Sequence, residues 1–323
     1  MTDAPYLDAY LAPLKPWLER ADVTDILVNR PCEVWVETTQ GAMTREAAPE
    51  LTELVLGRLA RQVAAASHQG VSRERPLLSA TLADGSRVQV IAPPATRGGL
   101  VLAVRRQAIA DLSLEDLGHA GLFSPSARAT TSPDQDAQLQ KLLEAKRYEG
   151  FLRAAVKARK SIVISGGAGA GKTTLLNALL KEISADERLI AIEDAPEIRL
   201  HHDNAIGLVA ARGEQGEARV TAEDLLAASL RMRPDRILLG ELRGAEAFSF
   251  LRAVNSGHPG SLTTVHADST SGALDQIALL AMTSGLDLGW THLQTYVRRI
   301  VDVVVQVEKS PSGRRVSDIA FNL

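Results

Sequence analysis

The chain has 323 residues, of which 45% are hydrophobic and 23% charged, and its formal net charge is −3. This composition is typical of a globular protein with two domains, and it excludes a disordered chain. It also excludes a protein drawn to nucleic acid or anionic lipid by its overall charge. The single cysteine, Cys32, excludes an internal disulfide and a zinc site built from cysteines. The first residues lack a basic and then apolar signal, and no apolar run approaches the ~20 residues of a membrane span, so we expect a cytoplasmic protein.

Residues 1–107 are predicted to form a separate α+β domain. Its apolar runs have the length and composition of strands, and two segments have the apolar spacing of helices. The predicted strands cover residues 25–29, 33–37, 77–82, 87–92 and 99–104. The predicted helices cover residues 6–20 and 51–67. Such a run of strands indicates a small sheet with helices packed on it.

Residues 108–148 differ from what precedes and follows them. They are rich in Ser, Thr, Pro, Asp and Ala, which is typical of a linker. From residue 149 to residue 323 strands and helices alternate, and this alternation favours a parallel sheet covered by helices. The predicted fold class is therefore α/β, with a nucleotide-binding domain that follows the smaller α+β domain.

A glycine-rich loop lies between a short apolar run and a helical pattern in the second domain. Its residues are Gly166, Gly167, Ala168, Gly169, Ala170, Gly171, Lys172, Thr173 and Thr174. They fit the phosphate-loop pattern, which needs a strand before it and a helix after it. Such a loop directs backbone N–H groups at phosphate oxygens, and the helix adds the positive end of its dipole. Lys172 is expected to reach the β- and γ-phosphates, and the Thr173 hydroxyl to hold Mg²⁺.

Two other predicted strands end in acidic residues. The run 189–192 is followed by Glu193 and Asp194, and the run 236–239 by Gly240 and Glu241. Because α/β sheets bind ligands at the carboxyl ends of their strands, we expect these acids beside the loop. Glu193 is predicted to orient an attacking water or to act on Mg²⁺ through water, unless it is only a solvated strand end. Glu241 is predicted to act as general base or to support Mg²⁺.

Histidines offer weaker signals. The predicted strand 261–265 delivers His266 to the same edge, where an imidazole can hydrogen-bond a γ-phosphate and report its loss. A lone histidine at a strand end is more often structural. His258, in a loop with Gly and Pro, has a weaker case still. His201 and His202 are expected at the surface, because no cysteine lies near them to complete a metal site.

These segments, in this order, resemble the secretion or traffic ATPases. The resemblance covers the phosphate loop, an acidic box at 192–194, a variant metal box at 240–243, a histidine box at 264–267 and the segment 230–236. Within that family, residues 23–31 and 34–37 look like the branch that powers type IV secretion and conjugation. The resemblance extends over nearly the whole chain outside the linker.

The resemblance implies a RecA-like ATPase domain that uses ATP and Mg²⁺. It implies a homo-hexameric ring held peripherally on the cytoplasmic face of the bacterial inner membrane, where secretion-channel components would be its partners. By similarity, Lys172 and Thr173 bind phosphate and Mg²⁺, Glu193 and Glu241 serve hydrolysis, and His266 senses the γ-phosphate. We expect no specific reading of nucleic-acid sequence.

The family also brings arginines of the N-terminal domain to the nucleotide. The candidates in this chain are Arg87 and Arg105, which are otherwise surface charges at strand ends. The roles of further arginines stay open between pairing with the acids and reaching a neighbouring subunit; they are Arg231, Arg233 and Arg243. Cys32 stands where a glycine would suit the turn after Pro31. The long linker leaves open whether the N-terminal domain covers its own or a neighbouring ATPase domain.

Three other functions compete with this interpretation. A pilus retraction motor shares the same boxes and differs in the N-terminal domain, whereas an extension motor with a four-cysteine metal module does not fit one cysteine. A helicase or packaging motor is disfavoured by the net charge of −3 and by 4% aromatic residues, which leave few stacking platforms. A scaffold that binds nucleotide but barely hydrolyses it is the third alternative.

Overall fold

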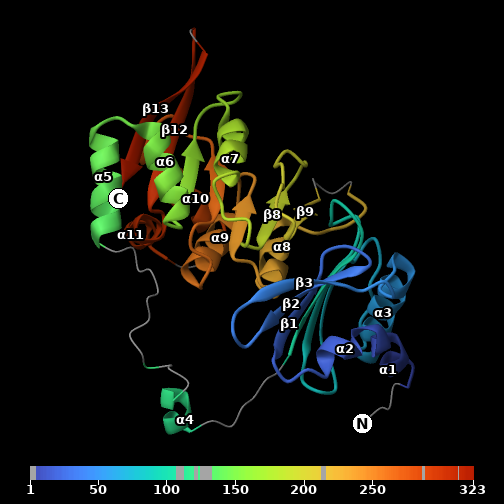
Figure 1. Cartoon of the computed structure of the whole chain (residues 1–323). Coiled ribbons are helices and arrows are strands. Elements are labelled where there is room, and N and C mark those ends of the chain that lie inside the picture. Colours follow the sequence, from blue (N-terminus) through green and yellow to red (C-terminus); the bar gives the residue numbers. More distant parts are fainter. Residues whose placement is uncertain are drawn as a thin grey trace.

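The computed structural model describes residues 5–106, 113–119, 123, 133–211, 216–285, 288–311 and 313–323. The chain forms two units, each built on its own sheet, with the N-terminal unit beside the β8–β9 end of the other (Figure 1). None of the helices in the described ranges combines the length and the apolarity needed to cross a bilayer.

The N-terminal unit is a six-stranded antiparallel sheet with helices on one face. Its strand order is β3-β2-β1-β6-β5-β4. The strands are β1 (Val23–Val28), β2 (Glu33–Thr38), β3 (Met43–Ala47), β4 (Leu77–Thr81), β5 (Arg87–Ile91) and β6 (Val101–Arg105). The helical segments are α1 (Pro5–Leu11), η1 (Ala12–Leu14), α2 (Lys15–Leu18) and α3 (Glu53–Ala66). Helix α3 begins where the Thr52 side chain accepts a hydrogen bond from Val55 N, and it buries an apolar stripe against the sheet.

Both faces of this sheet are buried at its central strands, such as β1. Ile26 and Val28 of β1 pack with the N-terminal helices, whereas Leu27 between them packs with the core of the C-terminal unit. Successive strand residues point to opposite faces, so one short strand serves two cores. Cys32 lies in the turn after β1, and its φ of 65° is the left-handed conformation in which a glycine would be expected. The turn therefore forms with a cysteine at this position.

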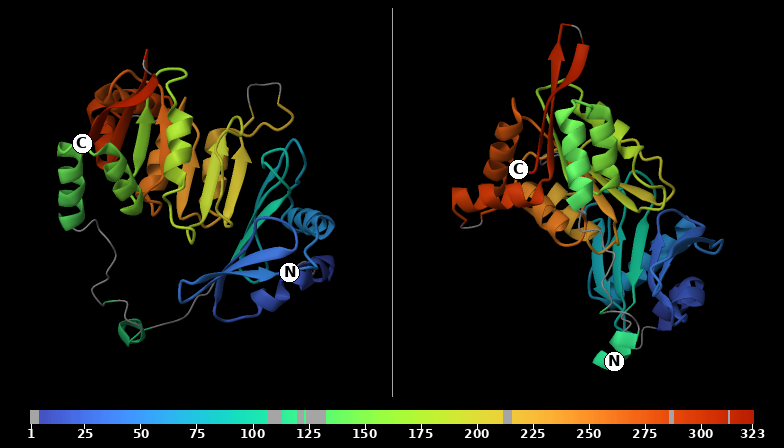
Figure 2. Two further views of the ribbon diagram at one scale, coloured as in Figure 1. Left: turned by 45° about the horizontal axis from the view of Figure 1, so that its top comes forward. Right: turned by 60° about the vertical axis from the view of Figure 1, so that its left-hand side comes forward.

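The C-terminal unit is a mostly parallel seven-stranded sheet between two layers of helices. Its strand order is β13-β12-β7-β11-β10-β8-β9, and only β13 runs antiparallel to its neighbour. The strands are β7 (Ile162–Ser165), β8 (Leu189–Glu193), β9 (Ala205–Val209), β10 (Arg236–Leu239), β11 (Leu262–Val265), β12 (Val303–Ser310) and β13 (Gly313–Phe321). Figure 2 shows the last two strands, in red, projecting beyond the rest of the sheet.

Alternate residues of the central strands enter two different cores. One core joins the sheet to α8 (Ala222–Ser229), α9 (Glu246–Asn255), α10 (Thr270–Met282) and α11 (Trp290–Ile300). The other joins it to α5 (Pro133–Glu144), α6 (Tyr148–Lys157) and α7 (Lys172–Leu180). In β10, for example, Ile237 and Leu239 belong to the first core and Leu238 to the second. The near-continuous apolar runs of these strands follow from this double burial.

The described part of the predicted linker, residues 108–148, includes the helices α4 and α5. Helix α4 (Leu114–His119) lies apart from both sheets (Figures 1 and 2). Helix α5 packs on α6 instead, and its Leu139 is buried with Phe151. Residues 133–144 are therefore part of the C-terminal unit, because Leu139, Leu142 and Leu143 give α5 an apolar face to bury.

Candidate active site

The glycine-rich loop connects β7 to α7, as the phosphate-loop pattern predicts. Two of its glycines are required by close approach of other segments. A Cβ on Gly166 would lie 2.4 Å from the carbonyl oxygen of Val307, and one on Gly171 would lie 2.9 Å from Cδ of Arg314. Gly171 also has a φ of 102°, which is unfavourable for other residues. The loop is thus held between its own strand and the hairpin of β12 and β13.

Lys172 points back over the loop that precedes it. Its Nζ donates to the carbonyl oxygens of Gly166 and Gly167 at 2.9 and 3.2 Å, and it lies 3.2 Å from Nδ1 of His266. Burial lowers the pKa of the Lys172 ammonium, and the nearby Glu241 carboxylate opposes this effect. The oxygens of a phosphate can replace these carbonyl oxygens as acceptors, because a charged acceptor makes a stronger hydrogen bond to the ammonium.

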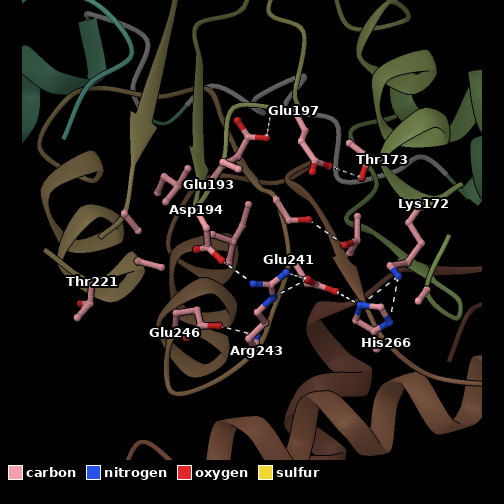
Figure 3. Close-up of a pocket in the computed structure, with 18 of the residues that line it drawn as sticks. Lys172, Thr173, Glu193, Asp194, Glu197, Thr221, Glu241, Arg243, Glu246 and His266 are labelled. Carbon is pink, nitrogen blue, oxygen red and sulfur yellow. Dashed lines mark hydrogen bonds and ion pairs between the residues drawn. The ribbon is translucent and has the colours of Figure 1, made fainter. Parts of the chain in front are cut away.

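Glu241 and His266 lie at the ends of their strands beside this lysine (Figure 3). His266 Nε2 is 2.5 Å from Oε1 of Glu241, and Arg243 Nε donates to Oε2 of Glu241 at 2.5 Å. Arg243 also reaches Asp194, with 2.6 Å between Nη1 and Oδ2. Lys172, His266, Glu241 and Arg243 therefore form one continuous polar chain.

Glu193 ends β8 and is nearly buried, with a side chain 4% exposed. Its Oε1 accepts hydrogen bonds from the backbone N–H groups of Glu197 and Ile198 at 3.0 and 2.7 Å. Glu197 in turn accepts a hydrogen bond from the Thr173 hydroxyl at 3.2 Å. Gly240 makes room for this arrangement, since a Cβ there would lie 3.0 Å from Cγ of Glu193.

These residues line one cavity of about 450 Å³, within the usual size range of small-molecule sites. The cavity brings together loop residues and the three predicted strand-end residues: Ala168, Gly169, Lys172, Thr173, Glu193, Glu241 and His266. Their meeting follows from the parallel sheet, whose strands β7, β8, β10 and β11 all end at this edge.

Arg87 and Arg105 lie elsewhere in the same chain. They face each other as partners across β5 and β6, and they line a second cavity of about 510 Å³ with Arg231. The structure therefore does not bring them to the phosphate loop of their own chain. Arg233 pairs with Glu37 of the N-terminal unit and with Asp235, so its place is at the contact between the units.

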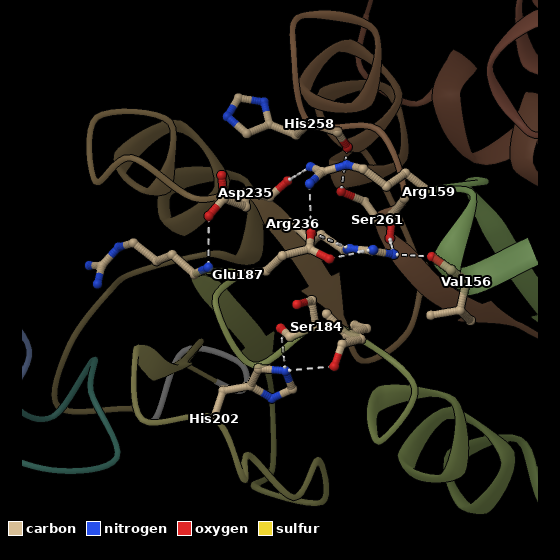
Figure 4. Close-up of polar contacts among 12 residues, drawn as sticks. Val156, Arg159, Ser184, Glu187, His202, Asp235, Arg236, His258 and Ser261 are labelled. Carbon is tan, nitrogen blue, oxygen red and sulfur yellow. Dashed lines mark hydrogen bonds and ion pairs between the residues drawn. The ribbon is translucent and has the colours of Figure 1, made fainter. Parts of the chain in front are cut away.

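The other histidines lie away from the cavity. His258 Nδ1 is 2.9 Å from the carbonyl oxygen of Ala253, and His202 Nε2 is 3.1 Å from that of Ser184 (Figure 4). Both rings are held against backbone carbonyls near the amino ends of the strands.

Sequence reasoning missed two arginines that contact this region. Arg97, from the loop between β5 and β6, forms an ion pair with Glu193, and Arg314 Nε donates to the carbonyl oxygen of Gly169 at 3.1 Å. Both lie in irregular or hairpin segments far along the chain from their partners. In the sequence, Arg97 is marked only by being a charged residue among small ones, directly before Gly98 and Gly99.

A glycine-rich loop, a lysine and acids gathered at the carboxyl edge of a parallel sheet define an α/β protein of the phosphate-loop class. Comparison with known proteins gives the family. Residues 8–310 match the model described as "Type II/IV secretion system protein". The chain thus belongs to the type II/IV secretion system protein family.

Individual relatives extend this similarity over nearly the full length. The chain is 37% identical to the type IV secretion system protein VirB11 of Bartonella henselae, over 97% of this chain and 92% of the relative. It is 40% identical to a PtlH homolog of Bordetella bronchiseptica, over 98% and 95%. The structure of the VirB11 ATPase from the Brucella suis type IV secretion system, in complex with sulphate, matches with a TM-score of 0.92 and 37% identity, covering 99% and 95% of the two chains.

These findings confirm the resemblance to the secretion ATPases and to their type IV secretion branch. They also confirm the predicted fold class, a RecA-like α/β domain with a smaller α+β N-terminal domain.

Proposed function

We propose that this protein hydrolyses ATP with Mg²⁺ and works as a homo-hexameric motor of a type IV secretion system. The observation that carries the proposal is the polar chain from Lys172 through His266 to Glu241 at the mouth of the glycine-rich loop. Relatives named as type IV secretion proteins, which match almost the whole chain, support this branch over a pilus retraction motor.

The loop would bind the phosphates of ATP. Lys172 would exchange its bonds to two loop carbonyls for phosphate oxygens, and the backbone N–H groups of Gly169, Gly171 and their neighbours would complete the cradle. The Brucella suis relative was solved with sulphate, a tetrahedral anion of the shape and charge of a phosphate group.

The residues beside the loop fit a magnesium ion. Mg²⁺ prefers oxygen ligands and usually keeps several waters. The Thr173 hydroxyl would bind it, and the carboxylates of Glu197 and Glu241 lie in the same cavity to support it through water. When bound, the ion would neutralise charge that develops on the phosphates.

Glu241, Glu193 and His266 would serve hydrolysis. The Glu241 carboxylate is held in one orientation between His266 and Arg243, as a residue that orients or deprotonates water must be. His266 lies between Lys172 and Glu241, so a γ-phosphate would contact it directly, and loss of that phosphate would release it. Glu193 lines the same cavity from β8.

Arg87 and Arg105 would act on the nucleotide of another subunit. Within one chain they line a separate cavity, so they can meet a nucleotide only where a second copy supplies the loop. In a head-to-tail ring every subunit would give its arginines to one neighbour and receive them from the other. Hydrolysis would then move the N-terminal unit as a rigid body, and this motion would be the output.

The ring would be held peripherally at the cytoplasmic face of the inner membrane by other components of the secretion system.

The proposal for the site is tested by Lys172→Ala, measured by nucleotide binding and by phosphate release. We expect both to fall by at least about 100-fold, because the lysine is the only loop side chain that carries charge to the phosphates. Undiminished turnover in this variant would show that the loop is not the site of hydrolysis.

A further inference from the structure

Backbone pairing joins the N-terminal unit to the edge of the C-terminal sheet. Arg97 N donates to the carbonyl oxygen of Gly207 at 2.9 Å, and Val209 N donates to that of Ala95 at 2.9 Å. Thr96 and Leu208 are therefore antiparallel partners, and β9 is the edge strand of its sheet. The loop between β5 and β6 thus pairs with the edge of the C-terminal sheet through one β-bridge.

This pairing carries the Arg97 side chain across β9 to the acid at the end of β8. The passage depends on Gly207, since a Cβ there would lie 2.4 Å from Cδ of Arg97. At the far end, Arg97 Nη1 donates to the carbonyl oxygen of Ile198 at 2.7 Å, and Nη2 forms the ion pair with Oε2 of Glu193. The guanidinium therefore contacts both Ile198 and Glu193, and the aliphatic part of the side chain lies against Gly207.

Glu193 is held from two opposite sides. Its Oε1 accepts the two backbone N–H bonds of Glu197 and Ile198, and its Oε2 faces Arg97. The side chains of Arg97 and Glu193 are 21% and 4% exposed, so water cannot replace the guanidinium freely. Loss of the cation would leave a nearly buried carboxylate without its charged partner, which is costly and frees the carboxylate to turn.

We propose that Arg97 is a positioning residue for Glu193, through which the N-terminal unit sets the orientation of this acid in its own chain. Arg97 is not among the described residues that line the cavity, so it acts through Glu193 rather than on the nucleotide. This inference rests on the proposed function, because it assigns a catalytic consequence to the orientation of Glu193. It differs from the roles of Arg87 and Arg105, which would cross to another subunit.

The test compares three single variants of the full chain by steady-state ATP hydrolysis. In Arg97→Gln we expect kcat to fall about 10- to 100-fold while KM for ATP changes less than about twofold, since the variant loses orientation of the acid and keeps the phosphate loop. Arg97→Lys keeps the charge and should recover part of the loss. The matched control is Arg73→Gln, which removes another ion pair between the units, to Glu217, at an exposed position. It should leave kcat unchanged.

Several results would overturn the proposal. An unchanged or increased kcat in Arg97→Gln would show that Arg97 does not support the acid. Equal losses in Arg97→Lys and Arg97→Gln, or a KM that rises as kcat falls, would assign Arg97 to packing alone. A loss of the same size in Arg73→Gln would show that any weakening of the contact between the units suffices.

A second measurement does not depend on hydrolysis. The melting temperatures of Arg97→Gln, Glu193→Gln and the double variant form a cycle. We expect the double variant to lose several degrees less than the sum of the single variants, because each single change leaves its partner unpaired. Additive shifts would overturn the pairing of Arg97 with Glu193. If the unaltered protein releases no phosphate, the proposed function fails, and the cycle still decides whether Arg97 holds Glu193.

Discussion

Both ends of the parallel sheet carry an arginine paired with a glutamate, but the arginine is buried at the amino end and exposed at the carboxyl end. At the amino end, Arg236 is 1% exposed and forms a bidentate pair with Glu187, at 2.6 and 2.8 Å (Figure 4). At the carboxyl end, Arg243 is 56% exposed and divides its bonds between Glu241 and Asp194 beside a cavity (Figure 3). The first arginine has a single buried arrangement, whereas the second has partners that a ligand can replace.

The rest of each cluster follows the same division. Arg236 also donates to the carbonyl oxygen of Val156 at 3.0 Å, and Arg159 adds a second cation to Glu187 at 2.6 Å. Lys172 at the other end donates to loop carbonyls that a phosphate can displace. Charged residues alone do not mark a functional site in this protein. The difference lies in burial and in whether the bonds can be exchanged.

The largest effect on turnover is expected from Glu241→Gln. Glutamine keeps the size of the side chain but removes the charge that pairs with His266 and Arg243, and it cannot accept a proton from water. We expect kcat to fall by about 10²- to 10⁴-fold, with little change in thermal stability, because the amide oxygen of glutamine can still accept from Arg243, whose side chain is 56% exposed. Phosphate release and melting curves measure the two effects. Turnover near that of the unaltered protein would instead support a nucleotide-gated scaffold.

Arg236→Met should have the opposite profile. Removal of Arg236 leaves Glu187 with Arg159 as its remaining cation. It also leaves the buried carbonyl oxygens of Val156 and Gly260 without this donor, and we expect a loss of about 3 kcal/mol in the free energy of unfolding. Urea denaturation measures it. The control is the double variant Arg236→Met and Glu187→Leu, which should recover part of the loss, because the remaining cation, Arg159, is 36% exposed and can be solvated by water. If the single variant kept its stability and lost turnover, the contrast between the two ends of the sheet would be wrong.

Thr221→Ala tests the contrast between structural and functional polar residues at a position that lines the cavity. Thr221 lines the nucleotide cavity, but its hydroxyl and N–H are both engaged with Asp224 in a capping box at the start of α8. We expect it to act as a structural residue, with a loss of about 1 kcal/mol in stability and unchanged kcat and KM. The comparison variant Thr221→Ser keeps the cap and should retain stability. A change in KM without a change in stability would mean that Thr221 contacts the nucleotide.

Much of the site was predictable because it depends on local patterns and one rule of topology. The loop has a fixed spacing, and Glu193, Glu241 and His266 each follow an apolar run of strand length. Once those runs are parallel strands, their ends must meet at one edge.

What escaped prediction depends on contacts between distant segments. Arg97 lies in a loop without periodicity, and its partner Glu193 belongs to the other unit. Arg87 and Arg105 were identified as candidates from the family resemblance. The sequence does not indicate whether they reach the phosphate loop of their own chain, and the structure places them at a separate cavity. Residues 133–144 were included in the predicted linker, whose residues are rich in Ser, Thr, Pro, Asp and Ala, although Leu139, Leu142 and Leu143 pack helix α5 on the C-terminal unit.

The β-bridge between Thr96 and Leu208 has a consequence for the solubility of the C-terminal unit. An open sheet edge offers unpaired N–H and C=O groups to any other extended chain, and natural proteins cover such edges to avoid aggregation. Here the cover for β9 comes from the other half of the molecule, through Ala95 and Arg97. A fragment cut at the linker would expose this edge. We therefore expect the N-terminal unit to protect the C-terminal unit from self-association as well as contacting Glu193.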